Sequence, residues 1–135
     1  MSGAVDRFGS AALHDGGFAY GARIASNSLI VTAGLSPLDA DGQIVGPDDP
    51  VAQMTRTVQC LDEILAEQRA QRADIAKLTT YVATTDHAVI GAAWQALDAA
   101  FDGAAPPAIV VGVTVLPYPR QLVEIEAIIA TGPVR

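Results

Sequence analysis

Two glutamates, Glu124 and Glu126, stand two positions apart within the apolar segment LVEIEAII, which spans residues 122–129. Side chains alternate between the two faces of a β-strand, so in a strand both carboxylates share one face with Leu122 and Ile128. Burying a carboxylate without a partner costs several kcal/mol or more. This face must therefore meet water, a binding cleft or another subunit, where a carboxylate can be hydrated, paired or used in acid–base chemistry.

Other residue types that often carry chemistry are scattered along the chain. His14, Cys60 and His87 lie far apart in the sequence and lack the spacing of metal ligands. The sequence also lacks the G-x-S-x-G, G-x-x-x-x-G-K, G-x-G-x-x-G and H-E-x-x-H motifs, and nothing in it favours a Ser-His-Asp assembly. We therefore expect neither a metal site nor a cofactor.

The composition predicts one packed domain over residues 1–135. Of these residues, 50% are hydrophobic and 17% are charged, which is typical of a globular chain. The formal net charge is -7, and Lys77 is the only lysine. Because phosphate backbones are bound by clustered Lys and Arg, we expect no nucleic-acid partner.

The sequence also indicates a compartment. No apolar run approaches the ~20 residues that a membrane-spanning helix needs, and the first residues show no charged-then-apolar signal pattern. Cys60 is the single cysteine and cannot form an internal disulfide. We expect no membrane contact and a cytoplasmic location.

The pattern of apolar residues predicts five strands and two helices. Strands are expected at residues 17–25, 29–34, 77–84, 108–116 and 122–130, with turns at Asn27–Ser28 and at residues 39–42. Asp49 and Pro50 form a helix start, and Asp86 can cap a second helix that residues 102–107 break. The first helix should end within residues 67–74. The apolar positions at helical spacing are Val51, Met54, Val58, Leu61 and Leu65, then Ile90, Trp94, Leu97 and Phe101.

These elements predict an α+β fold of order β-β-α-β-α-β-β, with one mixed sheet. Each helix has one apolar face to bury, and a single sheet can take both helices on one side. The apolar positions of the last strand, Val123, Ile125, Ala127 and Ile129, can pack on those helices. The opposite side of the sheet is left uncovered, and Glu124 and Glu126 point there.

The sequence resembles the YjgF/YER057c/UK114 (Rid, or endoribonuclease L-PSP) family. The matching segments fall in order from about Phe18 to Thr131 and are IVTAGLSPLDADGQIVG, TRTVQCLDEILAEQ, KLTTYVATT, PPAIVVGVTVLP and LVEIEAIIA. The resemblance implies a chorismate-mutase-like fold and a homotrimer, with a small-molecule cleft between each pair of subunits. It also implies that the face with the two glutamates lies toward this cleft and the subunit interface.

The resemblance further implies an activity, the hydrolysis of imines and enamines such as 2-aminoacrylate to keto acids and ammonia. In that mechanism an arginine clamps the substrate carboxylate and a glutamate positions or activates water. A tyrosine, a serine and backbone groups complete the pocket. A bidentate Arg–carboxylate pair fixes orientation, and a glutamate within reach of water can act as a general base.

Only part of this set is present here. Tyr20 matches the family tyrosine, and Glu124 matches the glutamate. Gly34 matches the glycine after the pocket serine, but Ala33 replaces the serine itself. The asparagine of the second helix corresponds to Gly91.

The arginine position falls on Ala108, or on Ile109 if the register slips by one residue, and neither is cationic. Losing such a clamp should cost on the order of 2–5 kcal/mol. Arg120 in the following loop is either a substitute or an exposed loop arginine, whereas Arg23 should face away from Tyr20. We therefore expect a poor 2-aminoacrylate deaminase whose pocket prefers neutral or weakly polar ligands to carboxylates.

Three functions remain open from the sequence. The first is a divergent hydrolase of a small imine, enamine or related carbonyl compound, with Tyr20 orienting the ligand and Glu124 acting on water. The second is a non-catalytic trimer that binds or senses a small molecule. The third is a ribonuclease, against which the acidic charge argues, because it would repel RNA.

Overall fold

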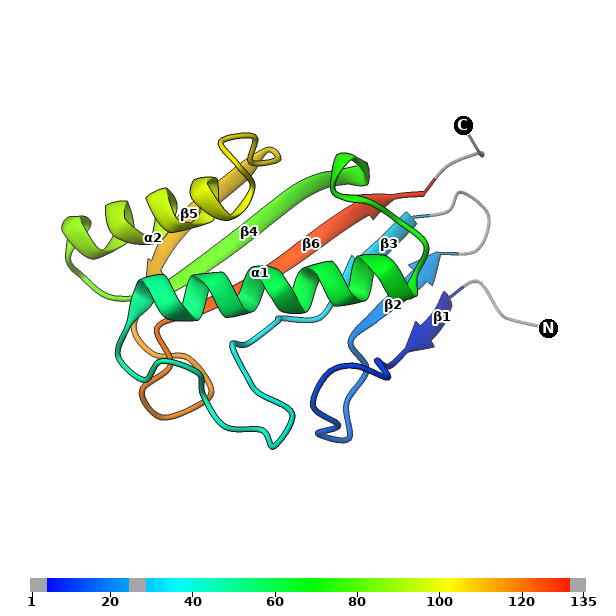
Figure 1. The fold of residues 1–135 in the computed structure, drawn as a ribbon, viewed down its shortest axis with the longest axis horizontal. Helices are drawn as coiled ribbons and strands as arrows, with labels where there is room; N and C mark the ends of the chain where they lie inside the picture. The colour runs from blue at the N-terminus through cyan, green and yellow to red at the C-terminus, as the bar shows by residue number, and fades with distance from the viewer. Residues whose placement is uncertain (1–4, 25–28, 132–135) are drawn as a thin grey trace.

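The structure is a computed structural model that describes residues 5–24 and 29–131. Its strands and α-helices form two layers, a sheet and a pair of helices on one of its faces (Figure 1). The elements are β1 (Val5–Phe8), β2 (Gly21–Ile24), β3 (Leu29–Thr32), α1 (Pro50–Glu67), the 3-10 helix η1 (Arg72–Asp74), β4 (Ile75–Ala83), α2 (His87–Ala100), β5 (Ala108–Val113) and β6 (Val123–Ala130). The predicted α+β class, with two helices on one side of a single sheet, is confirmed.

The sheet has the strand order β1-β2-β3-β6-β4-β5. The pair β4 and β5 is parallel and is connected through α2, while the other neighbours are antiparallel, so the sheet is mixed as predicted. The last strand in the sequence, β6, thus lies inside the sheet between β3 and β4. This position holds the two glutamates near the middle of the sheet.

The N-terminal strand was not expected from the sequence. Val5–Phe8 contains Asp6 and Arg7 at its centre and shows no clear alternation, but it pairs in antiparallel register with β2. Backbone pairing with a neighbouring edge, and not an intrinsic pattern, makes this segment a strand. The predicted turn at Asn27–Ser28 lies outside the described residues.

The predicted helix starts are confirmed. The Asp49 carboxylate accepts hydrogen bonds from the backbone N–H groups of Val51 at 3.0 Å and Ala52 at 3.1 Å, with Pro50 in the first turn. The Asp86 carboxylate accepts one from the N–H of Ala88 at 2.8 Å. These caps satisfy backbone donors that the first helical turn leaves unpaired.

Two members of the predicted apolar stripes are not buried. Val51 is 51% exposed, so the stripe of α1 begins one turn later, at Met54. Trp94 is 41% exposed, whereas Ala93 and Leu97 are fully buried. Each residue turns a helix by about 100°, so when Ala93 and Leu97 mark the buried line, Trp94 falls on its flank.

The two faces of β6 differ as the alternation predicts. Val123, Ile125, Ala127 and Ile129 are buried, while Glu124 and Glu126 are half-buried and Ile128 is exposed. We call the side of the sheet that α1 and α2 leave uncovered the open face. Glu124 and Glu126 both lie on it.

Candidate functional site

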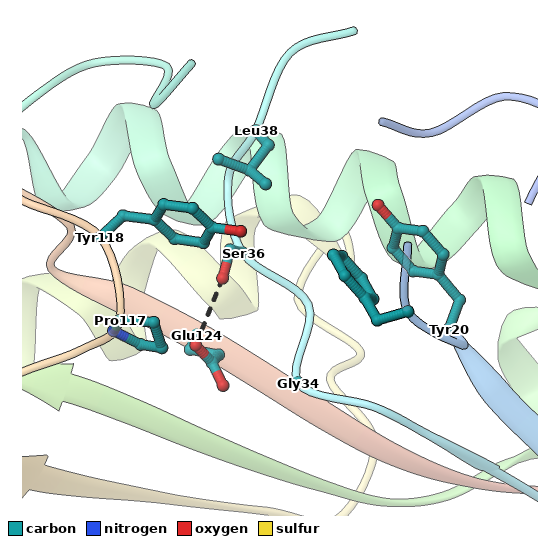
Figure 2. Close-up of a pocket in the computed structure, with 8 residues that line it drawn as sticks. Tyr20, Gly34, Ser36, Leu38, Pro117, Tyr118 and Glu124 are labelled. Carbon is teal, nitrogen blue, oxygen red and sulfur yellow. Dashed lines mark hydrogen bonds between the residues drawn. The ribbon is translucent and has the colours of Figure 1, made fainter. Parts of the chain in front are cut away.

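Glu124 lies in a hollow of about 190 Å³ at the end of β3. The hollow is built from four chain segments that are distant in the sequence: the residues before β2, the residues after β3, the loop before β6, and β6 itself (Figure 2). Its lining residues are Phe18, Tyr20, Gly34, Ser36, Leu38, Pro117, Tyr118 and Glu124. Two of the residues that the sequence singled out as catalytic, Tyr20 and Glu124, thus meet in one place.

The Glu124 carboxylate is held by two neutral side chains. The Ser36 hydroxyl donates a hydrogen bond to Oε1 of Glu124 at 3.2 Å, and Nε2 of Gln121 lies 3.3 Å from the same oxygen. Gln121 is almost fully buried and also donates to the Ser36 hydroxyl and to the carbonyl of Val123, both at 2.9 Å. Fixed donors of this kind hold the carboxylate in one orientation, and no cation among the described residues forms an ion pair with it.

Backbone pairing brings Gly34 against this carboxylate. Leu35 and Ile125 exchange two hydrogen bonds, of 2.7 and 3.1 Å, beyond the end of β3. The preceding residue, Gly34, therefore lies beside Glu124, and an ideal Cβ built on Gly34 would be 2.8 Å from Cδ of Glu124. Only glycine leaves room for the carboxylate in this position.

Tyr20 lines the hollow with its ring, but its hydroxyl is already engaged. The hydroxyl donates to the backbone carbonyl of His14 at 2.6 Å, and the side chain is only 6% exposed. Burial, followed by the nearby Cys60 and Tyr118, raises the pKa of Tyr20 to about 12. A neutral phenol whose proton is already donated to a backbone carbonyl fits a packing role in the wall of the hollow. A role of Tyr20 in orienting a ligand stays a prediction.

Several residues of the hollow, and Gln121 beside it, were missed by the sequence reasoning. Ser36 supplies a hydroxyl beside Glu124, although the expected serine position is Ala33. Tyr118 and Gln121 come from the loop before β6, and the N–H of Tyr118 donates to the Gln121 side chain at 3.1 Å. These residues lie in loops, where no periodicity links them to the glutamate. The short separation between Gln121 and Glu124 was the only available signal.

Other predicted site residues lie elsewhere in the described chain. Ala33 precedes Gly34 and lines a different, shallow hollow together with Arg7 and Ala19. Gly91 is part of α2, in the helical layer. Neither of the two lines the hollow that contains Glu124.

Arg120 is an exposed loop residue in an ion pair. Its Nε lies 2.7 Å from the Asp48 carboxylate, and its side chain is 64% exposed. It lines a neighbouring hollow together with Gln43 and Pro47, and of the described residues this hollow shares only Tyr118 with the hollow of Glu124. In this arrangement Arg120 does not take the place of the missing arginine in the hollow of Glu124.

Sheet register distinguishes the two candidates for the arginine position. Ala108 pairs with the fully buried Leu78 and packs against the core beneath the helices. Ile109 pairs with Thr79, which itself pairs with Glu126, so Ile109 lies on the open face and is 47% exposed. Of the two positions, only Ile109 shares a face with the carboxylates. Neither lines the hollow of Glu124.

The second glutamate has its own partner. The Tyr81 hydroxyl donates a short hydrogen bond to Oε1 of Glu126, and this bond is the main reason that the pKa of Tyr81 is raised. Glu126 lines a different hollow, together with Lys77, Thr79 and Ile128 among others. Glu126 is therefore a second carboxylate on the open face that lies outside the hollow of Glu124, and it can serve as a control for Glu124.

No group of three His, Cys, Asp or Glu side chains within residues 5–24 and 29–131 could hold a metal ion. In the same part of the chain, no helix is both long and apolar enough to cross a membrane.

Comparison with known proteins identifies the family. The sequence model of the Endoribonuclease L-PSP family matches residues 15–131. The chain belongs to this family, the YjgF/YER057c/UK114 or Rid family. Among curated proteins, no sequence matches the chain.

Solved structures of other Rid-family proteins share the fold. The YjgF protein of Escherichia coli is 25% identical over 93% of this chain and 98% of its own, with a TM-score of 0.73. Rv2704 of Mycobacterium tuberculosis is 25% identical over 94% of this chain and 99% of its own, with a TM-score of 0.71. YyfB of Yersinia pestis, described as a Rid protein of unknown function, is 28% identical over 94% and 98%, with a TM-score of 0.70.

Proposed function

We propose that this Rid-family protein hydrolyses a small imine, enamine or related carbonyl compound that lacks a carboxylate at the usual place. The observation that carries the proposal is the Glu124 carboxylate, oriented by Ser36 and Gln121 in a hollow of about 190 Å³. A carboxylate oriented by fixed donors can take a proton from a water molecule next to a bound substrate.

The proposed reaction uses this carboxylate twice. Glu124 removes a proton from water while the water oxygen bonds to the carbon of a protonated C=N group, which gives a carbinolamine. The glutamic acid then returns the proton to nitrogen, the C–N bond breaks as the C=O bond forms, and the leaving ammonia takes the proton of the hydroxyl group. An iminium and water thus yield a carbonyl compound and an ammonium ion, with no oxidant or reductant.

The proposal includes assembly as a homotrimer, with a neighbouring subunit closing the hollow. Ile109 and Ile128 are large apolar side chains that the open face exposes, at 47% and 39%. Large apolar side chains on a sheet face that no helix covers can be buried by a second copy of the chain. Light scattering at micromolar concentration should report three times the mass of the chain, and a stable monomer would contradict both the trimer and the interface cleft.

The activity can be tested with imines generated in situ by amine and amino-acid oxidases. We expect the protein to accelerate release of ammonia and carbonyl product from imines without a carboxylate more than from 2-aminoacrylate. An absence of acceleration across the whole panel would contradict the proposed hydrolase.

A second candidate is a ligand-binding or sensing trimer without turnover. It is favoured by the engaged hydroxyl of Tyr20 and by the apolar residue at the arginine position, because both reduce the set of reactive groups. Ligand-induced thermal stabilisation without product release would support this function. Ribonuclease activity is less favoured, since the net charge of -7 repels RNA.

A further inference from the structure

The hollow of Glu124 combines aromatic walls with a single charged group. Phe18, Tyr20 and Tyr118 supply three rings, and the rings of Phe18 and Tyr20 are 5.0 Å apart. Figure 2 shows Tyr118 and Tyr20 on opposite sides of the hollow, with Glu124 on the side of Tyr118, below Ser36. The faces of aromatic rings carry partial negative charge, and cations bind over them when water is displaced.

The charged residues around the hollow leave it negative. Glu124 is the only charged residue in its lining within the described chain, and its partners Ser36 and Gln121 are neutral. Behind the wall, Arg56 donates to the carbonyl of Leu38 at 2.9 Å, and Arg56 and Asp15 act on the Tyr20 hydroxyl with opposite signs. No cation within the described residues therefore lines the hollow to neutralise Glu124.

We propose that this hollow selects a small organic cation, an alkylammonium or iminium group, in preference to neutral or anionic compounds of the same shape. This inference rests on the proposed function, since it takes the same hollow as the substrate site. It goes beyond the expectation from the sequence that the pocket prefers neutral ligands to carboxylates. A carboxylate and three aromatic rings attract positive charge, so a cation should bind more tightly than a neutral compound. It also gives a reason why a carboxylate clamp is not needed.

Three probes of nearly identical shape test the inference by binding alone. Choline is a cation, 3,3-dimethylbutanol is its neutral analogue, and 3,3-dimethylbutanoate is an anionic one. Titration of the full chain, followed by calorimetry or ligand-observed NMR, should show choline binding about tenfold more tightly than the alcohol. The anion should bind more weakly than the alcohol.

Variants separate the two sources of the preference. Glu124→Gln should lower choline affinity about tenfold and leave the affinity for the alcohol nearly unchanged. Tyr118→Leu should reduce the choline preference, and Tyr118→Phe should retain it, because the ring face is kept. Glu126→Gln is the control, since it removes a carboxylate from the same face outside the hollow.

Equal affinities for choline and the alcohol, tighter binding of the anion, or no binding of any probe would overturn the cation inference. Product release from imines is measured separately. Turnover without a cation preference would overturn this inference only, and a cation preference without turnover would contradict the proposed hydrolase only.

Discussion

Gly34 and Glu124 touch beyond the end of β3 so closely that the glycine has no space for a side chain. A Cβ on Gly34 would overlap Oε2 of Glu124 and lie 2.8 Å from its Cδ. The double hydrogen bond between Leu35 and Ile125 fixes the two backbones, so the strain of an added methyl group must be relieved by the carboxylate. Gly34 therefore determines where the Glu124 side chain can lie.

Gly34→Ala should displace the carboxylate and lower turnover or ligand affinity by roughly 10- to 100-fold, because small misplacements of reacting groups are costly. Kinetics and probe binding measure this effect. Gly9→Ala is the control, since a Cβ at Gly9 meets nothing within 4 Å. If Gly34→Ala behaves like Gly9→Ala, Glu124 does not need its observed position.

The arginine position can be tested by restoring a cation. Ile109→Arg should raise turnover of 2-aminoacrylate-type imines by about tenfold or more, and Glu124→Ala should remove that gain. Ala108→Arg should instead lower the free energy of unfolding by about 2 kcal/mol or more, because the charge would enter the core beneath the helices. Deaminase assays measure the effect of Ile109→Arg on turnover, and denaturant unfolding measures the effect of Ala108→Arg on stability.

The Ile109→Arg experiment also tests the interface. Glu126 is about 10 Å from Ile109 across two strands, and Glu124 is about 7 Å further along β6. The Glu124 of the same subunit is therefore out of reach of an arginine at position 109, and a gain in turnover would support a trimer in which this side chain acts on the Glu124 of a neighbouring subunit. If the wild-type protein already hydrolyses 2-aminoacrylate as fast as arginine-containing relatives do, the claim that it lacks a carboxylate clamp is wrong.

Tyr20 should make stability depend on pH in the alkaline range. Its pKa is raised from 10.0 to about 12 in the folded state, so its contribution is complete below pH 10 and is lost as pH rises toward 12. The loss amounts to roughly 2 kcal/mol. Tyr20→Phe should lack this loss, and at about pH 8 it should be less stable by about 1 kcal/mol through the missing bond to His14. Urea unfolding from about pH 8 to pH 12 measures the stability of both proteins. If the stability of wild type and Tyr20→Phe falls equally with pH, Tyr20 is not the group responsible.

Local patterns predicted the parts of the fold that local physics decides. The alternation in β6 and the caps at Asp49 and Asp86 depend on a few neighbouring residues, and all three are confirmed. Trp94 was misplaced because its helical spacing matched the stripe, while the residues of α2 that enter the core are Ala93 and Leu97. Which side of a helix faces the sheet is decided by the tertiary structure.

The site itself was predicted less completely than the fold. The positions of Tyr20, Gly34 and Glu124 came from a family resemblance, and the structure brings them together. Ser36 and Tyr118 lie in loops, where spacing along the sequence does not predict spacing in space. Choosing between Ala108 and Ile109 required the parallel register of β4 and β5, which no local pattern contains.

The most direct test of the central claim compares two carboxylates on the same face of the sheet. Ammonia and carbonyl release from imines without a carboxylate is measured for wild type, Glu124→Gln and Glu126→Gln. Glu124 lines the hollow and Glu126 does not, so Glu124→Gln should lower the rate about 100-fold or more while Glu126→Gln stays near wild type. Equal rates for all three proteins, or a larger loss from Glu126→Gln, would contradict catalysis by Glu124 in this hollow.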